Sequence, residues 1–453
     1  MNENRDLEPA PQAAYRLEDY PIADVTDQIG FLSQSAEVLV REGKLPEAER
    51  IYEAILKTAP HNLPALTFLA MRALHTGDYE ASVRHLRVAL QVNPKSAVLH
   101  ENLAITRRAQ GLPEAALGAI DQAIECAPGS ATPHLHRGFI LEDLGQMDHA
   151  LLAFGRALKL EPALSVNPAT QAPGLRELAQ EAIGRLAPIR YEAIDRAARE
   201  VEKLFGTTLP ERARKFLAVF KGTEKPIYED PLQRPEFICY PDLHPKPWFE
   251  RGEFAWIRAY EAETAAILAD YRAVLNEFGS QGAEVPYVSE AARADPRWRD
   301  LAGSSDWSSL HLYQSGTPQA GVIERCQHTF STLKHLPLAR GQGHAPEIFF
   351  STLKPGTSLP AHHGLSNAKL TIHLGLEVPG LCGIRVGDET RSWREGRCLI
   401  FDDSFEHAAW NRGTLPRVVL IADIWNPALA PIEQELVAQV IEAHDNFNRT
   451  YLL

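Results

Sequence analysis

The stretch EIFFSTLKPGTSLPAHHGLSNAKLTIHLGL, residues 347–376, decides the fold of the second half of the chain. Two apolar runs in it, EIFFSTLK from Glu347 and KLTIHLGL from Lys369, have the length of strands and are separated by Gly, Pro and Ser. Four further short runs follow: GIRV from Gly383, TRSW from Thr390, CLIF from Cys398 and RVVLIADIW from Arg417. Many short strands at such spacing predict a double-sheet jelly roll or a barrel.

Alternation within KLTIHLGL indicates how one of these strands is buried. Leu370, Ile372 and Leu374 point to one face of the strand, whereas Thr371 and His373 point to the other. The first face can pack against a core, and the second can face water. Helices are expected on either side of the strand region, near residues 254–278 and 431–444.

Histidines lie near two of the predicted strand ends. His362 and His363 follow the first strand in PAHHGLSN, and His407 ends FDDSFEH soon after the strand CLIF. In a barrel, the loop after one strand and the end of a later strand can meet at the same mouth, where two neutral imidazoles suit a first-row transition metal. The alternative is that these histidines are polar rim residues whose hydrogen bonds are satisfied within the protein.

The first half of the chain repeats itself with a period of 34 residues. Two residue types keep this period: Gly43, Gly77, Gly111 and Gly145, and Pro60, Pro94, Pro128 and Pro162. The glycine supplies a tight turn between two helices, and the proline marks where the second helix ends. The pattern resembles the tetratricopeptide repeat in four copies, which implies an all-α solenoid that binds peptides or holds another domain in place.

These patterns predict a multidomain α + β chain in which an all-α tetratricopeptide solenoid precedes a β-rich domain. The expected parts are a disordered tail over residues 1–26, four repeats over 27–165, a helical cap and linker over 166–225 and the β domain over 226–453. The last boundary rests on composition, because prolines and aromatic residues become frequent after it.

Composition and charge exclude several classes of partner. The 453 residues are 45% hydrophobic and 23% charged, as in ordinary globular proteins. A net charge of -13 argues against nucleic acid and anionic membranes as partners. Five cysteines without a CxxC pair fit neither a disulfide framework nor a structural zinc site, and no run of 18 apolar residues occurs. We therefore expect a cytoplasmic protein.

Two segments of the second half, residues 347–376 and GIRVGDETRSWREGRCLIFDDSFEHAAWNRGTLPRVVLIADIW from Gly383, resemble the aspartyl/asparaginyl β-hydroxylase family. YPDLHPKPWF from Tyr240 resembles the start of that family's catalytic domain. The resemblance implies a double-stranded β-helix (jelly-roll) oxygenase that uses iron(II), 2-oxoglutarate and O2. The implied reaction is hydroxylation of the β carbon of Asp or Asn in a peptide or protein, which the repeats would recruit.

The resemblance also implies the iron ligands, residue by residue. His362 matches the first iron ligand and His407 the second, whereas His363 stands at a position without that role. Most non-haem iron oxygenases have a carboxylate two residues after the first histidine. That position is Gly364 here, as in the family, so water is expected to complete the coordination.

A second set of residues is implied for 2-oxoglutarate. Arg417 matches the family arginine that grips the distal carboxylate, and Ser351 matches the hydroxyl beside it. His373 matches a histidine near the other carboxylate. The family commonly has arginine where this chain has Thr371, and Lys369 on the same strand face is the candidate to replace it.

Three carboxylates, Asp402, Asp403 and Glu406, surround His407 in the sequence. Because the second nitrogen of a ligating histidine is usually held by a hydrogen-bond acceptor, we expect one of them to orient this imidazole. A simple loop turn is the alternative.

Three other functions compete with hydroxylation of a peptide or protein. A family relative could act on a free amino acid, a lipid or a peptide natural product, although the repeats favour a peptide. The chain could be a repeat scaffold with a catalytically silent oxygenase domain, although His362, His407, Ser351 and Arg417 are intact. A metal-binding barrel without 2-oxoglutarate is disfavoured by Arg417.

Overall fold

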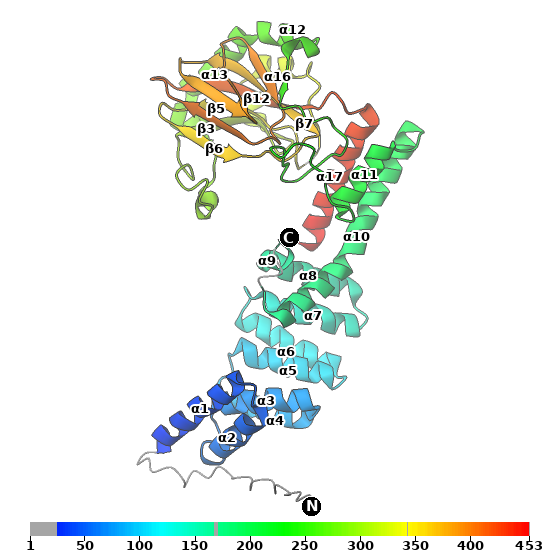
Figure 1. Cartoon of the computed structure of the whole chain (residues 1–453), viewed down its shortest axis with the longest axis vertical. Coiled ribbons are helices and arrows are strands. Elements are labelled where there is room, and N and C mark those ends of the chain that lie inside the picture. The colour runs from blue at the N-terminus through cyan, green and yellow to red at the C-terminus, as the bar shows by residue number, and fades with distance from the viewer. Residues whose placement is uncertain (1–24, 167–170, 342, 453) are drawn as a thin grey trace, which may run out of the picture. The chain divides into compact units, whose positions relative to one another are not determined.

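The computed structural model describes residues 25–166, 171–341 and 343–452, so residues 1–24 of the predicted tail lie outside it. The chain divides into two compact units, Met1–Pro188 with Asn448–Leu453, and Ile189–Phe447. This division falls inside the segment 166–225, which we expected to be a cap and linker. An all-helical region precedes a β-rich region, which confirms the prediction of a helical repeat part followed by a β-rich domain (Figure 1).

The first unit is built from antiparallel helix pairs. The helices are α1 Val25–Arg41, α2 Leu45–Thr58, α3 Leu63–Thr76, α4 Tyr79–Val92, α5 Ala97–Ala109, α6 Pro113–Cys126, α7 Ala131–Asp143 and α8 Met147–Leu160. A periodic glycine lies in the turn of each pair with φ between 72° and 81°, a conformation that favours glycine. After Pro162 the chain forms one helical turn, α9 Ala163–Val166, and the long helix α10 Pro173–Phe205 follows.

The second unit combines helices with many short strands. Its helices after α10 are α11 Glu211–Lys221, α12 Ile257–Ala262, α13 Thr264–Phe278, α14 Ser280–Ala283, α15 Ala320–Ile323, α16 Gln327–Leu333 and α17 Pro431–Tyr451, with 3-10 turns η3 Arg251–Glu253 and η4 Glu290–Ala294. Its strands are β1 Trp248–Phe249, β2 Val285–Pro286, β3 Trp307–Gln314, β4 Thr317–Pro318, β5 Ile348–Leu353, β6 Ser358–His362, β7 Lys369–Glu377, β8 Cys382–Val386, β9 Glu389–Arg391, β10 Cys398–Phe401, β11 His407–Asn411 and β12 Arg417–Trp425.

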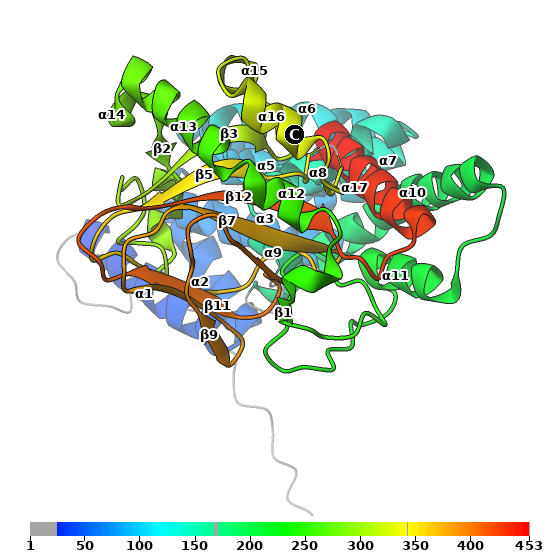
Figure 2. The same ribbon diagram turned by 90° about the horizontal axis from the view of Figure 1, so that it is seen from above.

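These strands form two antiparallel sheets that pack against each other. The larger has the order β1-β10-β7-β12-β5-β3-β2, with β4 beside β3, and the smaller has the order β6-β11-β8-β9. Figure 2 shows α12, α13 and α16 on one side of the larger sheet and strands β9 and β11 on the other. Leu370, Ile372 and Leu374 belong to the core under the helices, whereas Phe349 shares a second core with Ile384 of the smaller sheet. The alternation predicted for KLTIHLGL is confirmed.

Some elements differ from the prediction. Strands β3, β6 and β11 were not predicted, and the sequences SLPAH and HAAWN of the last two are short and only partly buried. The helix expected over 254–278 is split into α12 and α13, and at the break Thr264 Oγ1 donates to the Glu261 carbonyl at 2.6 Å. Helix α17 continues beyond the predicted end at residue 444 to Tyr451.

Two helical glycines of the repeat unit provide a matched test of its packing. A Cβ added at buried Gly138 in α7 would lie 2.2 Å from the Phe154 ring of α8, whereas exposed Gly118 in α6 has open space around it. Gly138→Ala should therefore cost about 1–3 kcal/mol through overpacking. Gly118→Ala should gain about 0.5–1 kcal/mol through helix propensity. Hydrogen exchange of peptides from α7 and α8 should become faster only in Gly138→Ala, and equal exchange in both variants would contradict this packing.

Candidate active site

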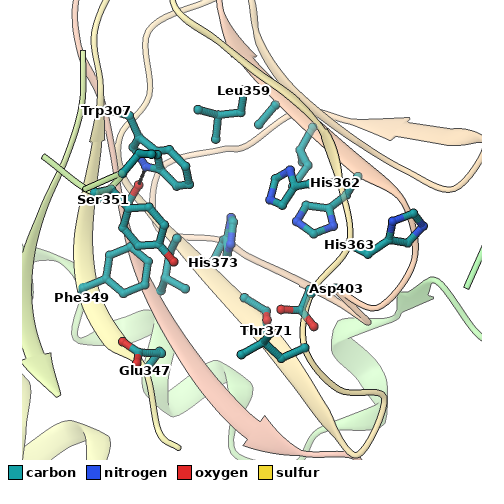
Figure 3. Close-up of a pocket in the computed structure, with 18 of the residues that line it drawn as sticks. Trp307, Glu347, Phe349, Ser351, Leu359, His362, His363, Thr371, His373 and Asp403 are labelled. Carbon is teal, nitrogen blue, oxygen red and sulfur yellow. Dashed lines mark hydrogen bonds between the residues drawn. The ribbon is translucent and has the colours of Figure 1, made fainter. Parts of the chain in front are cut away.

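A cavity of about 460 Å³ lies between the two sheets and collects all of the residues predicted for the site. The predicted residues that line it are Ser351, His362, Lys369, His373, His407 and Arg417. Figure 3 shows Ser351 and Trp307 at one side of the cavity, His373 in the middle and Thr371 beside Asp403 at another side. The six predicted residues span 66 positions of the chain, from Ser351 to Arg417, and all of them line this one cavity.

The two histidines predicted to bind metal face each other across a strand pair. His362 ends β6 and His407 begins β11, and the antiparallel register places them opposite each other with ring centroids 4.1 Å apart. His362 Nδ1 lies 2.8 Å from the Pro360 carbonyl, and His407 Nδ1 lies 2.9 Å from the Phe405 carbonyl. Because a carbonyl only accepts, each Nδ1 carries the hydrogen and each Nε2 keeps its lone pair.

Burial keeps both imidazoles neutral, since it lowers the pKa of His362 and of His407 to about 4. Neutral imidazoles with a free Nε2 are what a divalent metal requires. The expectation that a carboxylate orients His407 was wrong, because the Phe405 carbonyl holds its Nδ1. Glu406 instead pairs with Arg385 at 2.7 Å, and His363 lines the same cavity at its edge (Figure 3).

Gly364 faces a carboxylate that comes from another part of the chain. A Cβ at Gly364 would lie 2.2 Å from Asp403 Cγ, so this space is taken. Asp403 Oδ1 is buried without a hydrogen-bond partner, and burial raises the pKa of this carboxyl group. Within the described residues, no group of three or more His, Cys, Asp or Glu side chains is arranged to hold a metal. The candidate ligand set is therefore the histidine pair.

One end of the cavity carries a buried positive charge. The Arg417 side chain is 1% exposed, its guanidinium lies 4.7 Å from the centre of the Trp393 ring, and its Nε has no partner. Burial lowers the pKa of Arg417 to about 10, and no carboxylate among the described residues pairs with it. Such a charge is costly unless an anion accompanies it. The site therefore fits a ligand with a carboxylate.

Two polar groups accompany Arg417 in this half of the cavity. Ser351 Oγ accepts a hydrogen bond from Trp307 Nε1 at 3.1 Å, which fixes the hydroxyl. His373 is buried, stacks on Trp393 with an angle of 7° between the rings, and has an Nδ1 without a partner. Burial lowers its pKa well below the usual range, so it can offer one N–H to an anion as a neutral ring.

Lys369 lies in the cavity but is already paired. Its Nζ is 2.8 Å from Asp423 Oδ2, and both side chains are buried. Thr371 Oγ1, at the position where the resemblance implies arginine, is buried and lies beside Asp403.

Sequence analysis missed several residues that line the cavity: Tyr287, Trp298, Trp307, Glu347, Trp393 and Asp423. Asp403 was expected near His407, but in a different role. A usable signal existed for Asp423, because alternation along RVVLIADIW puts it on the same face as Arg417. Trp393 ends the predicted strand TRSW but lies between β9 and β10, and Trp298 lies in a turn after η4, where no periodic pattern predicts its direction.

Comparisons with known proteins match both parts of the chain to families. The model for aspartyl/asparaginyl beta-hydroxylase matches residues 261–427, and a tetratricopeptide repeat model matches residues 39–100. Human aspartate beta-hydroxylase domain-containing protein 2 is 32% identical over 209 residues, 45% of this chain and 54% of the relative. Mouse aspartyl/asparaginyl beta-hydroxylase is 26% identical over 420 residues, 91% of this chain and 50% of the relative.

The chain thus spans about half the length of these curated relatives. Among solved structures, a crystal structure of MamA is 21% identical, covering 33% of this chain and 91% of its own, with a TM-score of 0.28. None of the described helices is long and apolar enough to cross a membrane. Two parts of the chain thus match known families: residues 39–100 match the tetratricopeptide repeat, and residues 261–427 match aspartyl/asparaginyl beta-hydroxylase.

Proposed function

We propose that this protein is an iron(II)- and 2-oxoglutarate-dependent dioxygenase that hydroxylates the β carbon of Asp or Asn in a peptide or protein. One observation carries the proposal: a pair of neutral histidines with free Nε2 atoms shares a cavity with a buried arginine that has no anionic partner. The first feature suits a metal and the second suits a carboxylate. A 2-oxo acid is the ligand class that uses both.

His362 and His407 would hold the iron through Nε2, with the carbonyls of Pro360 and Phe405 fixing the ring orientations. When bound, iron(II) would supply the activation of O2 that couples decarboxylation of 2-oxoglutarate to hydroxylation of a carbon. Gly364 has no side chain that could bind the metal, and the Asp403 carboxylate occupies the space where a side chain would lie.

Arg417 would bind the distal carboxylate of 2-oxoglutarate. A guanidinium offers two parallel N–H groups to a carboxylate, and the fixed Ser351 hydroxyl lies in the same half of the cavity. His373 would donate to the second carboxylate with its free ring nitrogen. Trp393, Phe401 and Ile421 line the cavity and exclude water around these contacts.

The architecture supports the remaining parts of the proposal. Two facing antiparallel sheets, with the histidines on the smaller and the arginine on the larger, fit a double-stranded β-helix. The helical repeats fit a surface that recruits a peptide or protein substrate. Hydroxylation of a peptide is therefore preferred over hydroxylation of a free amino acid.

His407→Ala should lose iron(II) binding, because one imidazole does not hold the metal. His363→Ala is the matched control and should keep one iron per chain. Iron content after anaerobic loading and desalting is the measurement, together with the weak visible absorption band that a 2-oxo acid gives when it chelates iron(II). Normal iron content in folded His407→Ala would remove His407 from the site.

Iron binding should persist to an unusually low pH. Burial lowers the pKa of both histidines to about 4, so protons compete with the metal less than they do for an ordinary histidine of pKa about 6.5. Iron affinity measured by competition with a chelator should stay nearly constant from about pH 8 to 6 and fall below about pH 5. A decline that begins near pH 6.5 would show that the rings are not buried as described.

Arg417→Met should keep iron and raise the concentration of 2-oxoglutarate needed for half-maximal succinate formation. A charge-assisted contact contributes roughly 1.5–3 kcal/mol, or about ten- to a hundredfold in affinity. Ser351→Ala should have a milder effect of about 1 kcal/mol. Arg272→Met, which removes an exposed arginine paired with Glu377, is the control and should behave as the wild type. Equal requirements in Arg417→Met and the control would place the anchor elsewhere.

A further inference from the structure

The larger sheet gives the cavity two ends of opposite charge. Strand β12 begins with Arg417 and reaches Asp423 six residues later on the same face. At about 3.3 Å per residue these side chains start roughly 20 Å apart. The proposed function assigns 2-oxoglutarate to the Arg417 end, so the substrate side chain has to use the other end.

A row of polar residues crosses that other end. Asp423 pairs with Thr371 across β12 and β7, and on its other side the Glu347 N–H donates to Asp423 Oδ2 at 3.0 Å. Asp403 joins the row from the turn before β11. Figure 3 shows Thr371 beside Asp403. Glu347 and Thr371 lie below His373 in this view, and Ser351 lies above it.

Charge at this end is dominated by carboxylates. Glu347, Asp403 and Asp423 line it, and Lys369 is the cation lining it within the described part of the chain. Lys369 Nζ is already bound to Asp423 Oδ2 at 2.8 Å. No cation is therefore left to pair with an incoming carboxylate, which would meet Asp403 and Glu347 instead. Like charges in a water-poor site repel each other strongly.

Two unpaired polar atoms at this end match a carboxamide. Asp403 Oδ1 and Thr371 Oγ1 are a buried acceptor and a buried hydroxyl that lie beside each other, and neither makes a hydrogen bond of normal geometry. The NH2 group of an asparagine side chain can donate to Asp403, and its carbonyl can accept from Thr371. An aspartate side chain offers acceptors only, so it can satisfy Thr371 but not Asp403.

We infer that the residue hydroxylated by this protein is asparagine and that aspartate is rejected. This inference rests on the proposed function and narrows it. Two features determine this specificity. Asp403 accepts a hydrogen bond from the carboxamide, and Asp423 pairs with Lys369 so that the lysine does not attract an anion. The site discriminates against aspartate for two reasons. An aspartate carboxylate cannot donate a hydrogen bond to Asp403, and it is repelled by the carboxylates already there.

Two peptide libraries with the same random flanks, one with central Asn and one with central Asp, provide the test. Full-length protein is incubated with iron(II), 2-oxoglutarate and each library, and peptide-dependent succinate and a 16 Da mass increase are measured. The Asn library should exceed the Asp library by about tenfold or more. Equal or greater reaction of the Asp library would overturn the inference, and so would succinate formation that neither library stimulates.

Succinate formed without any peptide reports the proposed function separately. Its complete absence, with either library or none, would overturn the dioxygenase assignment and the asparagine preference with it. Its presence together with a preference for Asp would leave the dioxygenase intact and remove the preference alone.

Charge variants locate the cause of the preference. Asp423→Asn frees Lys369 from its anion. Asp403→Asn removes the negative charge and replaces one acceptor oxygen with a donor NH2 group, while it keeps the Lys369–Asp423 pair. Each should shift the Asn-to-Asp ratio toward Asp by about tenfold. Glu377→Gln, a carboxylate on the same sheet that pairs with Arg272 outside the cavity, should keep the wild-type ratio. An unchanged ratio in both cavity variants, with normal peptide-independent succinate, would overturn the proposed selection.

Discussion

The antiparallel pairing of β6 with β11 is the constraint on which the rest of the site depends. It places His362 opposite His407, so that two residues 45 positions apart meet with ring centroids 4.1 Å apart. The carbonyls of Pro360 and Phe405, each two residues before its histidine, then fix both Nδ1 atoms and leave both Nε2 atoms free. A one-residue slip of this register would turn one of the rings away from its partner.

The larger sheet sets what surrounds this pair. Its inner face carries a buried arginine without an anion at one end and a lysine–aspartate pair with further carboxylates at the other. A buried unpaired guanidinium destabilises the empty fold by several kcal/mol. In the proposed function, a carboxylate of 2-oxoglutarate would offset this cost. The same sheet would then provide one end that binds an anionic cosubstrate and another end where an anion is disfavoured.

Periodicity in the sequence predicted the repeats and most of the long strands. The six residues predicted for the site came mainly from the resemblance to a known family, and all six line the cavity. The strands β6 and β11 were missed because SLPAH and HAAWN are short and half-buried and so lack a clear alternation. The partner of Gly364 was missed for another reason. Asp403 reaches it through the packing of two distant turns, and no spacing in the sequence encodes that contact. Likewise, only the register of β7 against β12 shows that Lys369 is neutralised by Asp423.

Diffraction at the iron absorption edge, from crystals grown without oxygen in iron(II) and 2-oxoglutarate, tests the central claim most directly. The account predicts one anomalous peak bonded to Nε2 of His362 and of His407, without a protein carboxylate as a ligand. It also predicts the distal carboxylate of 2-oxoglutarate on Arg417. A peak bonded to Asp403 or Asp423, or 2-oxoglutarate bound away from Arg417, would contradict it.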